Sequence, residues 1–449
     1  MEEVVKDASL GQLLFNFILL NVIFIIGYQS VAKKKTSKII WVLIILFCLF
    51  SFWGGDYFSY KAGFGKLTKD FRDPLYYYIQ EISLNYTMYR FLIWGVAVLL
   101  YYYAAKRLKL PMTIAAFSFA TVSMLSFSYS RSSLGLCLYL LGGTYLIKPV
   151  KGNELLGYLF GFVLILLSYY GHRSLLPMIA ASPLFFFRLT KQRAVFALLM
   201  IPVFALVVSR FMSAFVVNAV SLGDGLDDFT DAAGRYARTT ERSYNWKGQL
   251  VSYWTYASYY VTYIVLAYKM LFAPKPYRNN RRTKSRKIYL MNSPVTGKSS
   301  SIAQVGSQQA HMEPLESHSK ISEGNKEDKT VPSEDIPVEG EVPGKGNGKP
   351  SRRANKRLRI HPFALKLLTI STLLVIVSSV FFVSGMRGAT QLIGYRYLVM
   401  AGPFLSLLLA YAYKRRLLSF RQLFYVLLLP ISHAEVAIFG KIFTGLTGL

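Results

Sequence analysis

Acidic residues and cysteine are scarce in this sequence. Only 23 Asp and Glu stand against 52 Lys and Arg, which gives a formal net charge of +29. The two cysteines, Cys48 and Cys137, both lie inside apolar runs, which excludes a disulfide framework or a cysteine metal cluster. Walker A, HExxH, GxSxG and paired-cysteine motifs are also absent from the sequence. ATP-driven transport and metalloprotease activity therefore have no support.

Apolar residues are abundant instead. They make up 53% of the chain, and aromatic residues alone make up 15%, which is more than a soluble domain carries. About 20 mostly apolar residues are needed to cross a bilayer as a helix, and such runs recur with short polar breaks. The sequence predicts an all-α polytopic integral membrane protein with about 12 transmembrane helices. The expected spans are 10–30, 39–53, 88–105, 111–130, 132–147, 154–171, 174–187, 194–220, 248–273, 363–384, 395–413 and 423–443.

Basic residues gather in alternate short loops. Bases without acids occur in 33–38, 106–109, 188–193 and 414–421, and the positive-inside rule places such loops in the cytoplasm. Loops 54–87 and 221–247 mix acids with bases and are expected outside, together with the N-terminus. Since the bases are loop residues of a membrane protein, their excess does not indicate a nucleic-acid partner.

One connection is much longer than the others. Residues 274–361 are rich in Lys, Arg, Gly, Ser, Pro and Glu and poor in aromatics, a composition that cannot bury enough surface to fold. We expect a disordered basic cytoplasmic loop that separates a membrane domain 1–273 from a second membrane part, 362–449. Its basic ends would attract anionic membrane lipids, and its middle could bind partners. A solvated insertion without a role explains the same composition.

Several isolated cations fall on the expected outer side. The stretch "YYGHRSLLP" carries His172 and Arg173 at the end of one predicted span, Arg131 opens another, and Arg387 and Arg396 lie in "SGMRGATQLIGYRYLVM". Guanidinium groups stay charged and fork onto phosphate oxygens, so this group suits a lipid-linked diphosphate. Each arginine alone is also explained as a helix-end residue that reaches the interface.

The same side offers a base and a sugar-binding surface. Neutral imidazole at His172 could accept a proton from a sugar hydroxyl, and a histidine that caps a helix or contacts lipid headgroups explains the residue equally well. In the first outer loop, Asp56 and Asp73 accompany Tyr57 and Tyr76, a mixture that suits an acceptor sugar. The run that contains Tyr76 has a strong competing explanation as an interfacial aromatic belt, which needs no ligand.

Two ionisable residues lie deep in the last apolar run. His433 and Glu435 occur in "LLLPISHAEVAIFGK", and charged groups at membrane depth are costly and usually functional. Being two positions apart, they are expected on different faces of a helix.

The order of these features resembles the EpsG family of bacterial exopolysaccharide proteins, relatives of the Wzy-type repeat-unit polymerases. The resemblance rests on "GGDYFSY", "DPLYYYI", Arg131 at a helix start, "GHRSLL" and "GYRYLVM". It covers about 50–190 and 385–415 and leaves out the long loop. Leu75 stands where the family tends to have a small residue, and Ser132 where a Gln often follows the arginine.

The resemblance implies a polysaccharide repeat-unit polymerase of the bacterial inner (cytoplasmic) membrane, acting in exopolysaccharide or capsule biosynthesis. Such a glycosyltransferase moves a growing glycan from undecaprenyl diphosphate onto a new lipid-linked oligosaccharide at the periplasmic face. The donor arrives activated, so no metal or other cofactor is needed. His172 or Asp73 would be the catalytic base, and Arg131, Arg173, Arg387 and Arg396 would bind the diphosphate.

Three other functions stay open. A transporter or flippase of the same lipid-linked oligosaccharide also needs many helices and cations for diphosphate. An O-antigen-ligase-like transferase would use the same chemistry with another acceptor. A membrane scaffold would recruit other polysaccharide-synthesis proteins through 274–361.

Overall fold

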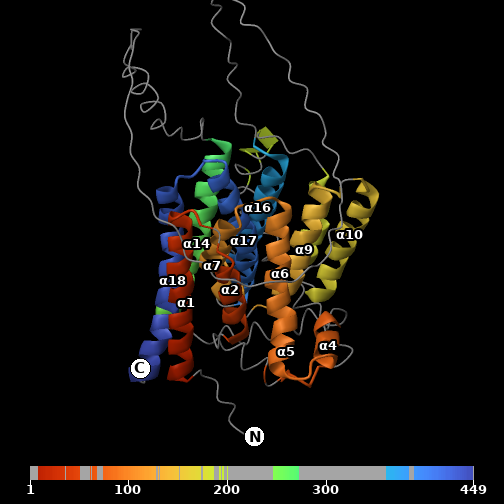
Figure 1. The fold of residues 1–449 in the computed structure, drawn as a ribbon. Helices are drawn as coiled ribbons and strands as arrows, with labels where there is room; N and C mark the ends of the chain where they lie inside the picture. Colours follow the sequence, from red (N-terminus) through yellow and green to blue (C-terminus); the bar gives the residue numbers. More distant parts are fainter. Residues whose placement is uncertain are drawn as a thin grey trace, which may run out of the picture. The chain divides into compact units, whose positions relative to one another are not determined.

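The computed structural model describes residues 9–35, 37–50, 61, 63–67, 74–127, 130, 132–150, 152–172, 175–186, 192–193, 195–196, 200, 246–272, 360–383 and 389–447. Within these residues the fold is all-helical, without strands (Figure 1). The chain divides into two compact units, one of 1–277 with 357–449 and a second of 278–356.

The described helices fall before and after residue 147, where α9 ends. The earlier helices are α1 (Leu10–Ala32), α2 (Ile39–Phe50), α4 (Pro74–Glu81), α5 (Tyr86–Arg90), the π-helix η1 (Phe91–Gly95), α6 (Val96–Arg107), α7 (Met112–Val122), α8 (Met124–Phe127) and α9 (Ser132–Ile147). The later helices are α10 (Glu154–Gly171), α11 (Leu176–Ala180), the 3₁₀ helix η3 (Ser182–Phe185), α14 (Trp246–Leu271), α16 (Pro362–Val383), α17 (Ala389–Lys414) and α18 (Phe420–Thr447).

Six described helical segments are long and apolar enough to cross a membrane, so the chain is a multi-pass membrane protein. These segments are Leu10–Ala32, Tyr86–Arg107, Glu154–Gly171, Pro362–Val380, Gly394–Lys414 and Phe420–Gly440. The last of them overlaps most of the predicted span 423–443. The described helices α2, α7 and α9 are apolar but shorter.

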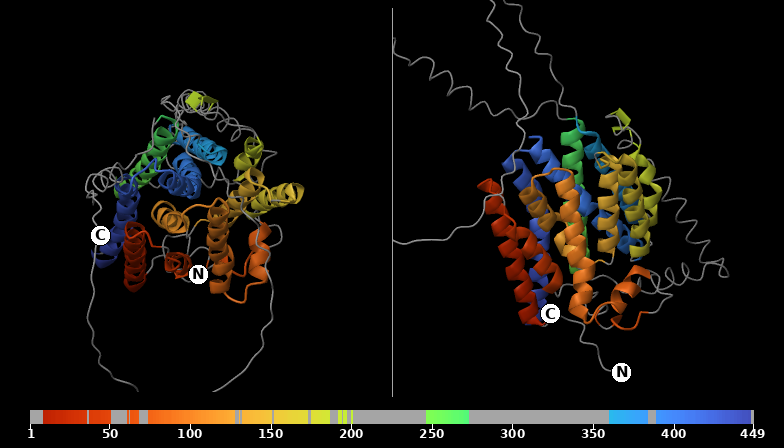
Figure 2. Two further views of the ribbon diagram at one scale, coloured as in Figure 1. Left: turned by 45° about the horizontal axis from the view of Figure 1, so that its top comes forward. Right: turned by 45° about the vertical axis from the view of Figure 1, so that its right-hand side comes forward.

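Burial separates central helices from peripheral ones. In α7 every residue from Thr113 to Val122 is buried, and Figure 2 shows this helix surrounded by the others. α17 packs against α7, α14 and α16 and is the most buried of the six long segments. By contrast α1 and α10 expose rows of large apolar side chains, among them Ile18 on α1 and Leu159 on α10. Such rows suit contact with lipid chains rather than water.

Two peripheral helices begin with the same local sequence signal. At α1, the Ser9 hydroxyl accepts from the backbone N–H of Gln12 while the Gln12 side chain accepts from the N–H of Ser9. Ser419 and Gln422 repeat this reciprocal pair at the start of α18. A Ser-x-x-Gln box satisfies two backbone donors that the first turn would leave unpaired. These helix starts therefore follow from short sequence motifs.

The predicted span 174–187 is wrong as a continuous helix. The structure has the short α11, followed by η3 with a proline in its first turn. Pro177 and Pro183 each remove a backbone donor and clash with the preceding turn, so the apolar run cannot continue as one helix. Most of the predicted span 194–220 lies outside the described residues.

The basic loops of the described region meet at one end of the helices. The Lys414 ammonium donates to the Lys109 carbonyl, and Arg107 donates to the carbonyl of Lys148. The backbone N–H of His361 donates to the Tyr411 hydroxyl at 2.8 Å. The residue before α16 thus lies beside the end of α17. We call this end the basic end. The other end, which carries α4 and α5, is called the opposite end.

Candidate functional site

His172 closes α10 at the opposite end. Its backbone N–H donates to the Ser168 carbonyl at 3.0 Å, and its own carbonyl accepts from Leu175 at 3.0 Å. The residue has extended backbone and a half-buried side chain. The imidazole therefore stands where a helix ends, which is the position the sequence predicted for it.

The end of α10 packs directly against the start of α9. A Cβ added to Gly171 would lie 2.9 Å from the Gly135 Cα and 3.7 Å from the Leu75 side chain of α4. Glycine permits this approach, because any side chain would push the two backbones apart. The contact brings His172 close to the helix that Arg131 precedes. Several predicted site residues lie outside the described residues, namely Asp56, Tyr57, Asp73, Arg131, Arg173 and Arg387.

The two remaining predicted residues differ in exposure. Arg396 lies exposed on the first half of α17. Tyr76, predicted to bind the acceptor sugar, is 0% exposed on α4, whereas Tyr78 on the same helix is 62% exposed. A ring buried in the core is not a platform for a sugar unless α4 moves. Sugar binding by Tyr76 stays a prediction, and Tyr78 is the tyrosine of α4 that a ligand could reach in this conformation.

A buried arginine belongs to this end of the molecule and was not among the predicted site residues. Arg90 is only 4% exposed, and its guanidinium donates to the Cys48 carbonyl at 2.6 Å. It also lies 5.5 Å from the ring of Trp94, whose indole N–H donates to the Ser130 carbonyl at 3.1 Å. The π-helix η1 spans the turn that joins Arg90 to Trp94. The signal was available, since an arginine inside a predicted span indicates function.

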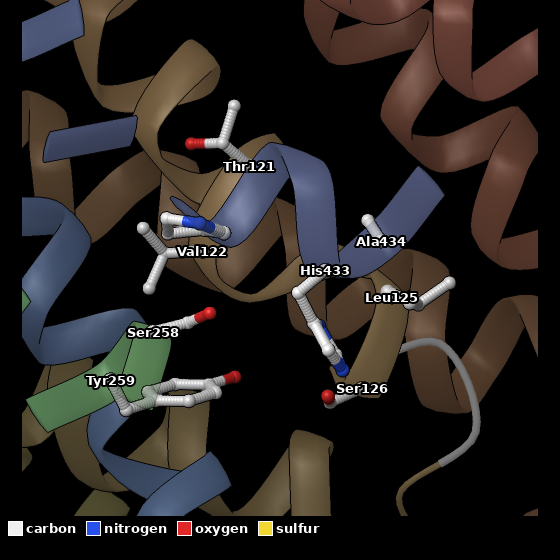
Figure 3. A pocket seen from close by; sticks show the side chains of 9 residues that line it. Thr121, Val122, Leu125, Ser126, Ser258, Tyr259, His433 and Ala434 are labelled. Atoms are coloured by element: carbon white, nitrogen blue, oxygen red, sulfur yellow. The ribbon is translucent and has the colours of Figure 1, made fainter. Parts of the chain in front are cut away.

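A second polar region lies inside the helices, around His433. Figure 3 shows His433 of α18, Ser126 of α8, and Ser258 and Tyr259 of α14 pointing toward one space, which Thr121 and Ala434 also line. The free volume is about 10 Å³, enough for about one water molecule. In this conformation the pocket does not admit a sugar.

Four of the nine residues that line this pocket carry hydroxyl groups. The Tyr259 hydroxyl is approached by Ser126 without reaching hydrogen-bond geometry. Ser126 in turn lies 3.4 Å from the Tyr395 hydroxyl of α17. Because Tyr395 directly precedes Arg396, the turn of α17 that carries the predicted diphosphate-binding arginine is linked to the pocket residue Ser126. The pocket lies in the half of the helices toward the opposite end.

The two ionisable residues of α18 face different neighbours, as predicted from their spacing. His433 shares a hydrogen bond with the Thr255 hydroxyl of α14. Glu435 accepts from the Asn21 side chain of α1 at 3.3 Å. Each group that would be costly in a membrane thus has a polar partner on a neighbouring helix.

Among the described residues no three His, Cys, Asp or Glu side chains gather as metal ligands. No family model, curated protein or solved structure matches this chain.

Proposed function

We propose that this protein is a polysaccharide repeat-unit polymerase of the bacterial inner membrane, with about 12 spans and its site on the outer side. The observation that carries the proposal is the meeting of α9, α10 and η1 at the opposite end. There the Gly135–Gly171 contact and the Trp94–Ser130 hydrogen bond place the ends of three helices together. Those ends carry His172 and the buried Arg90. The resemblance to the EpsG family supports the same site.

The residues suit transfer from a lipid diphosphate. The bond between the anomeric carbon of the growing glycan and the diphosphate oxygen breaks, and the electron pair leaves with the diphosphate. The acceptor hydroxyl oxygen forms the new bond, and its proton passes to His172 or to Asp73. Guanidinium groups at Arg396, Arg131, Arg173 and Arg387 would stabilise the charge that develops on the leaving diphosphate, most strongly where water is scarce.

The test uses the purified full chain in vesicles with one synthetic undecaprenyl-diphosphate repeat unit, without ATP or metal. A ladder of added repeats, followed by mass spectrometry, is the expected product. Replacing a general base lowers a rate by about 10²–10⁴-fold, so His172→Ala should slow chain growth by at least about 100-fold. Arg396→Ala should also slow it, because one diphosphate contact is lost.

Arg421→Ala is the matched control. Arg421 is exposed like Arg396 but lies at the start of α18, at the basic end. It should grow chains at the rate of the unchanged protein. Unaltered substrate across several repeat-unit chemistries, or wild-type chain lengths in His172→Ala, would refute the polymerase.

Transport of the same lipid-linked oligosaccharide is the second candidate, and one observation favours it. His433 and Glu435 lie within α18, between α14 and α1, and not at either end. Ionisable groups at that depth are typical of pathways through a membrane. A transporter would move labelled lipid-linked oligosaccharide between leaflets without lengthening it, so the same vesicles separate the two functions.

A further inference from the structure

Three helices at the basic end finish in the same unusual way. In the described residues, the only non-glycine positions with positive φ are Lys34 (φ 54°), Lys109 (φ 53°) and Arg416 (φ 59°). They follow α1, α6 and α17. All three residues are cations, although the left-handed conformation after a helix is normally occupied by glycine.

The hydrogen bonds around each position define a Schellman ending. Lys35 N–H bonds the Ser30 carbonyl, Leu110 N–H bonds the Ala105 carbonyl, and Leu417 N–H bonds the Ala412 carbonyl. In each case the cation is the left-handed residue just before the donor. Glycine would fit these positions without the steric conflict of a Cβ. The left-handed backbone of the helix ending therefore does not explain why a long side chain stands there, although the helix dipole favours a positive charge.

The three cations are accessible at the surface of the protein. Each is exposed, and none makes a side-chain hydrogen bond or ion pair with the described residues. Their charges are therefore free for an external anion.

Neighbouring contacts join the three endings into one surface. Lys414 donates to the Lys109 carbonyl, which ties the end of α17 to the end of α6. Thr113, at the start of α7, donates to the Lys35 carbonyl at 3.3 Å and accepts from the Ser37 N–H at 3.2 Å. This ties the end of α1 to the same turn. Glu154 is the one acid among the described residues of this end.

We propose that Lys34, Lys109 and Arg416 form a binding surface for the phosphate headgroups of anionic membrane lipids, which we call the lipid collar. The ends of membrane-crossing helices lie at headgroup level, where anionic lipids attract Lys and Arg. Three helix endings fix the backbone at these positions, so less backbone order is lost on binding than in a flexible basic tail. The lipid collar is independent of the proposed polymerase activity.

The test measures how anionic lipid shifts thermal unfolding of the purified full chain in neutral detergent. Phosphatidylglycerol should raise the unfolding midpoint more than phosphatidylcholine does. The triple variant Lys34→Gly, Lys109→Gly, Arg416→Gly removes the charges while it relieves the backbone. Its midpoint without anionic lipid should equal or exceed that of the unchanged protein, and at least half of the phosphatidylglycerol shift should be lost.

Two control variants separate charge from backbone and position. Lys34→Arg, Lys109→Arg, Arg416→Lys keeps every charge and should keep the shift. Lys61→Ala with Lys66→Ala removes exposed cations beyond α2 and should keep the shift too.

A full shift in the glycine variant would overturn the lipid collar. If inorganic phosphate alone shifts the midpoint of the unchanged protein as much as phosphatidylglycerol does, the surface binds a free anion and not a lipid. The single glycine variants give the same readout if the triple variant does not fold.

Discussion

At the scale of single residues, His361 stands just before α16, outside the six long apolar segments. Burial and the nearby cations Arg415, Lys148 and Lys414 lower the pKa of His361 below its ordinary value. Its Nδ1 also accepts from the Phe363 N–H at 3.4 Å, which requires an unprotonated nitrogen. The folded protein therefore favours the neutral form of this imidazole.

The pH dependence follows from that direction. Above about pH 6.5 both the folded and unfolded chains carry a neutral His361, so its contribution to stability is fully present. As the pH falls from about 6.5 through the lower folded pKa, the unfolded chain binds the proton more readily, and stability is lost. The unfolding midpoint of the unchanged protein should fall over this range more steeply than that of His361→Gln. Parallel curves would show that His361 does not contribute.

At the scale of elements, the pair α9 and α10 depends on glycine. A Cβ on Gly142 would lie 2.7 Å from the Gly161 carbonyl oxygen, and a Cβ on Gly161 would lie 2.9 Å from the Gly142 carbonyl oxygen. Both obstacles are backbone atoms, which cannot move aside as a side chain can. Small residues allow helices to approach closely where no hydrophobic force drives them together.

Gly142→Ala should therefore lower the free energy of unfolding by about 1–3 kcal/mol, the usual cost of overpacking. Gly11→Ala is the control, since a Cβ on Gly11 of α1 meets nothing within 4 Å. It should leave stability unchanged or raise it by up to about 1 kcal/mol, because alanine favours a helix. Denaturant titration in mixed micelles measures both. Equal effects of the two substitutions would contradict a backbone contact between α9 and α10.

The same elements show what sequence could predict. The all-helical membrane architecture and the different faces of His433 and Glu435 follow from run length and helical period. The structure confirms the helical class with six long apolar segments among the described residues and the different neighbours of His433 and Glu435, while about 12 spans stay a prediction. The break at Pro177 and Pro183 was missed because the predicted span rested on the apolar composition of 174–187 and not on the two prolines within it. Arg90 and the hydroxyl pocket were missed for another reason. The residues around each of them come from distant segments of the chain. Only the packing of the folded protein brings α14, α17 and α18 beside Ser126.

At the scale of the whole molecule, the long insertion joins two helices that run in opposite directions. Tyr260 of α14 bonds Ser379 of α16 at 2.6 Å, and Tyr263 bonds Thr372 at 2.8 Å. From the first pair to the second, the residue number rises in α14 and falls in α16, so the two helices are antiparallel. The end of α14 therefore lies near the start of α16. From the second pair, Leu271 is about 12 Å along one helix and Pro362 about 15 Å along the other, toward the same end. A short connection can therefore replace the insertion.

Replacing Arg278–Lys356 by about 20 Gly and Ser residues, which span about 25 Å on average, should leave the unfolding midpoint unchanged. These residues form a unit separate from 1–277 and 357–449. If the protein is a polymerase, the shortened chain should also extend the lipid-linked repeat unit at the rate of the full chain, because every residue proposed for the site remains. Scaffolding predicts a different pattern, namely an unchanged purified chain in vesicles but loss of polymer in cells. Loss of activity in vesicles with an unchanged midpoint would assign 278–356 a part in the reaction itself.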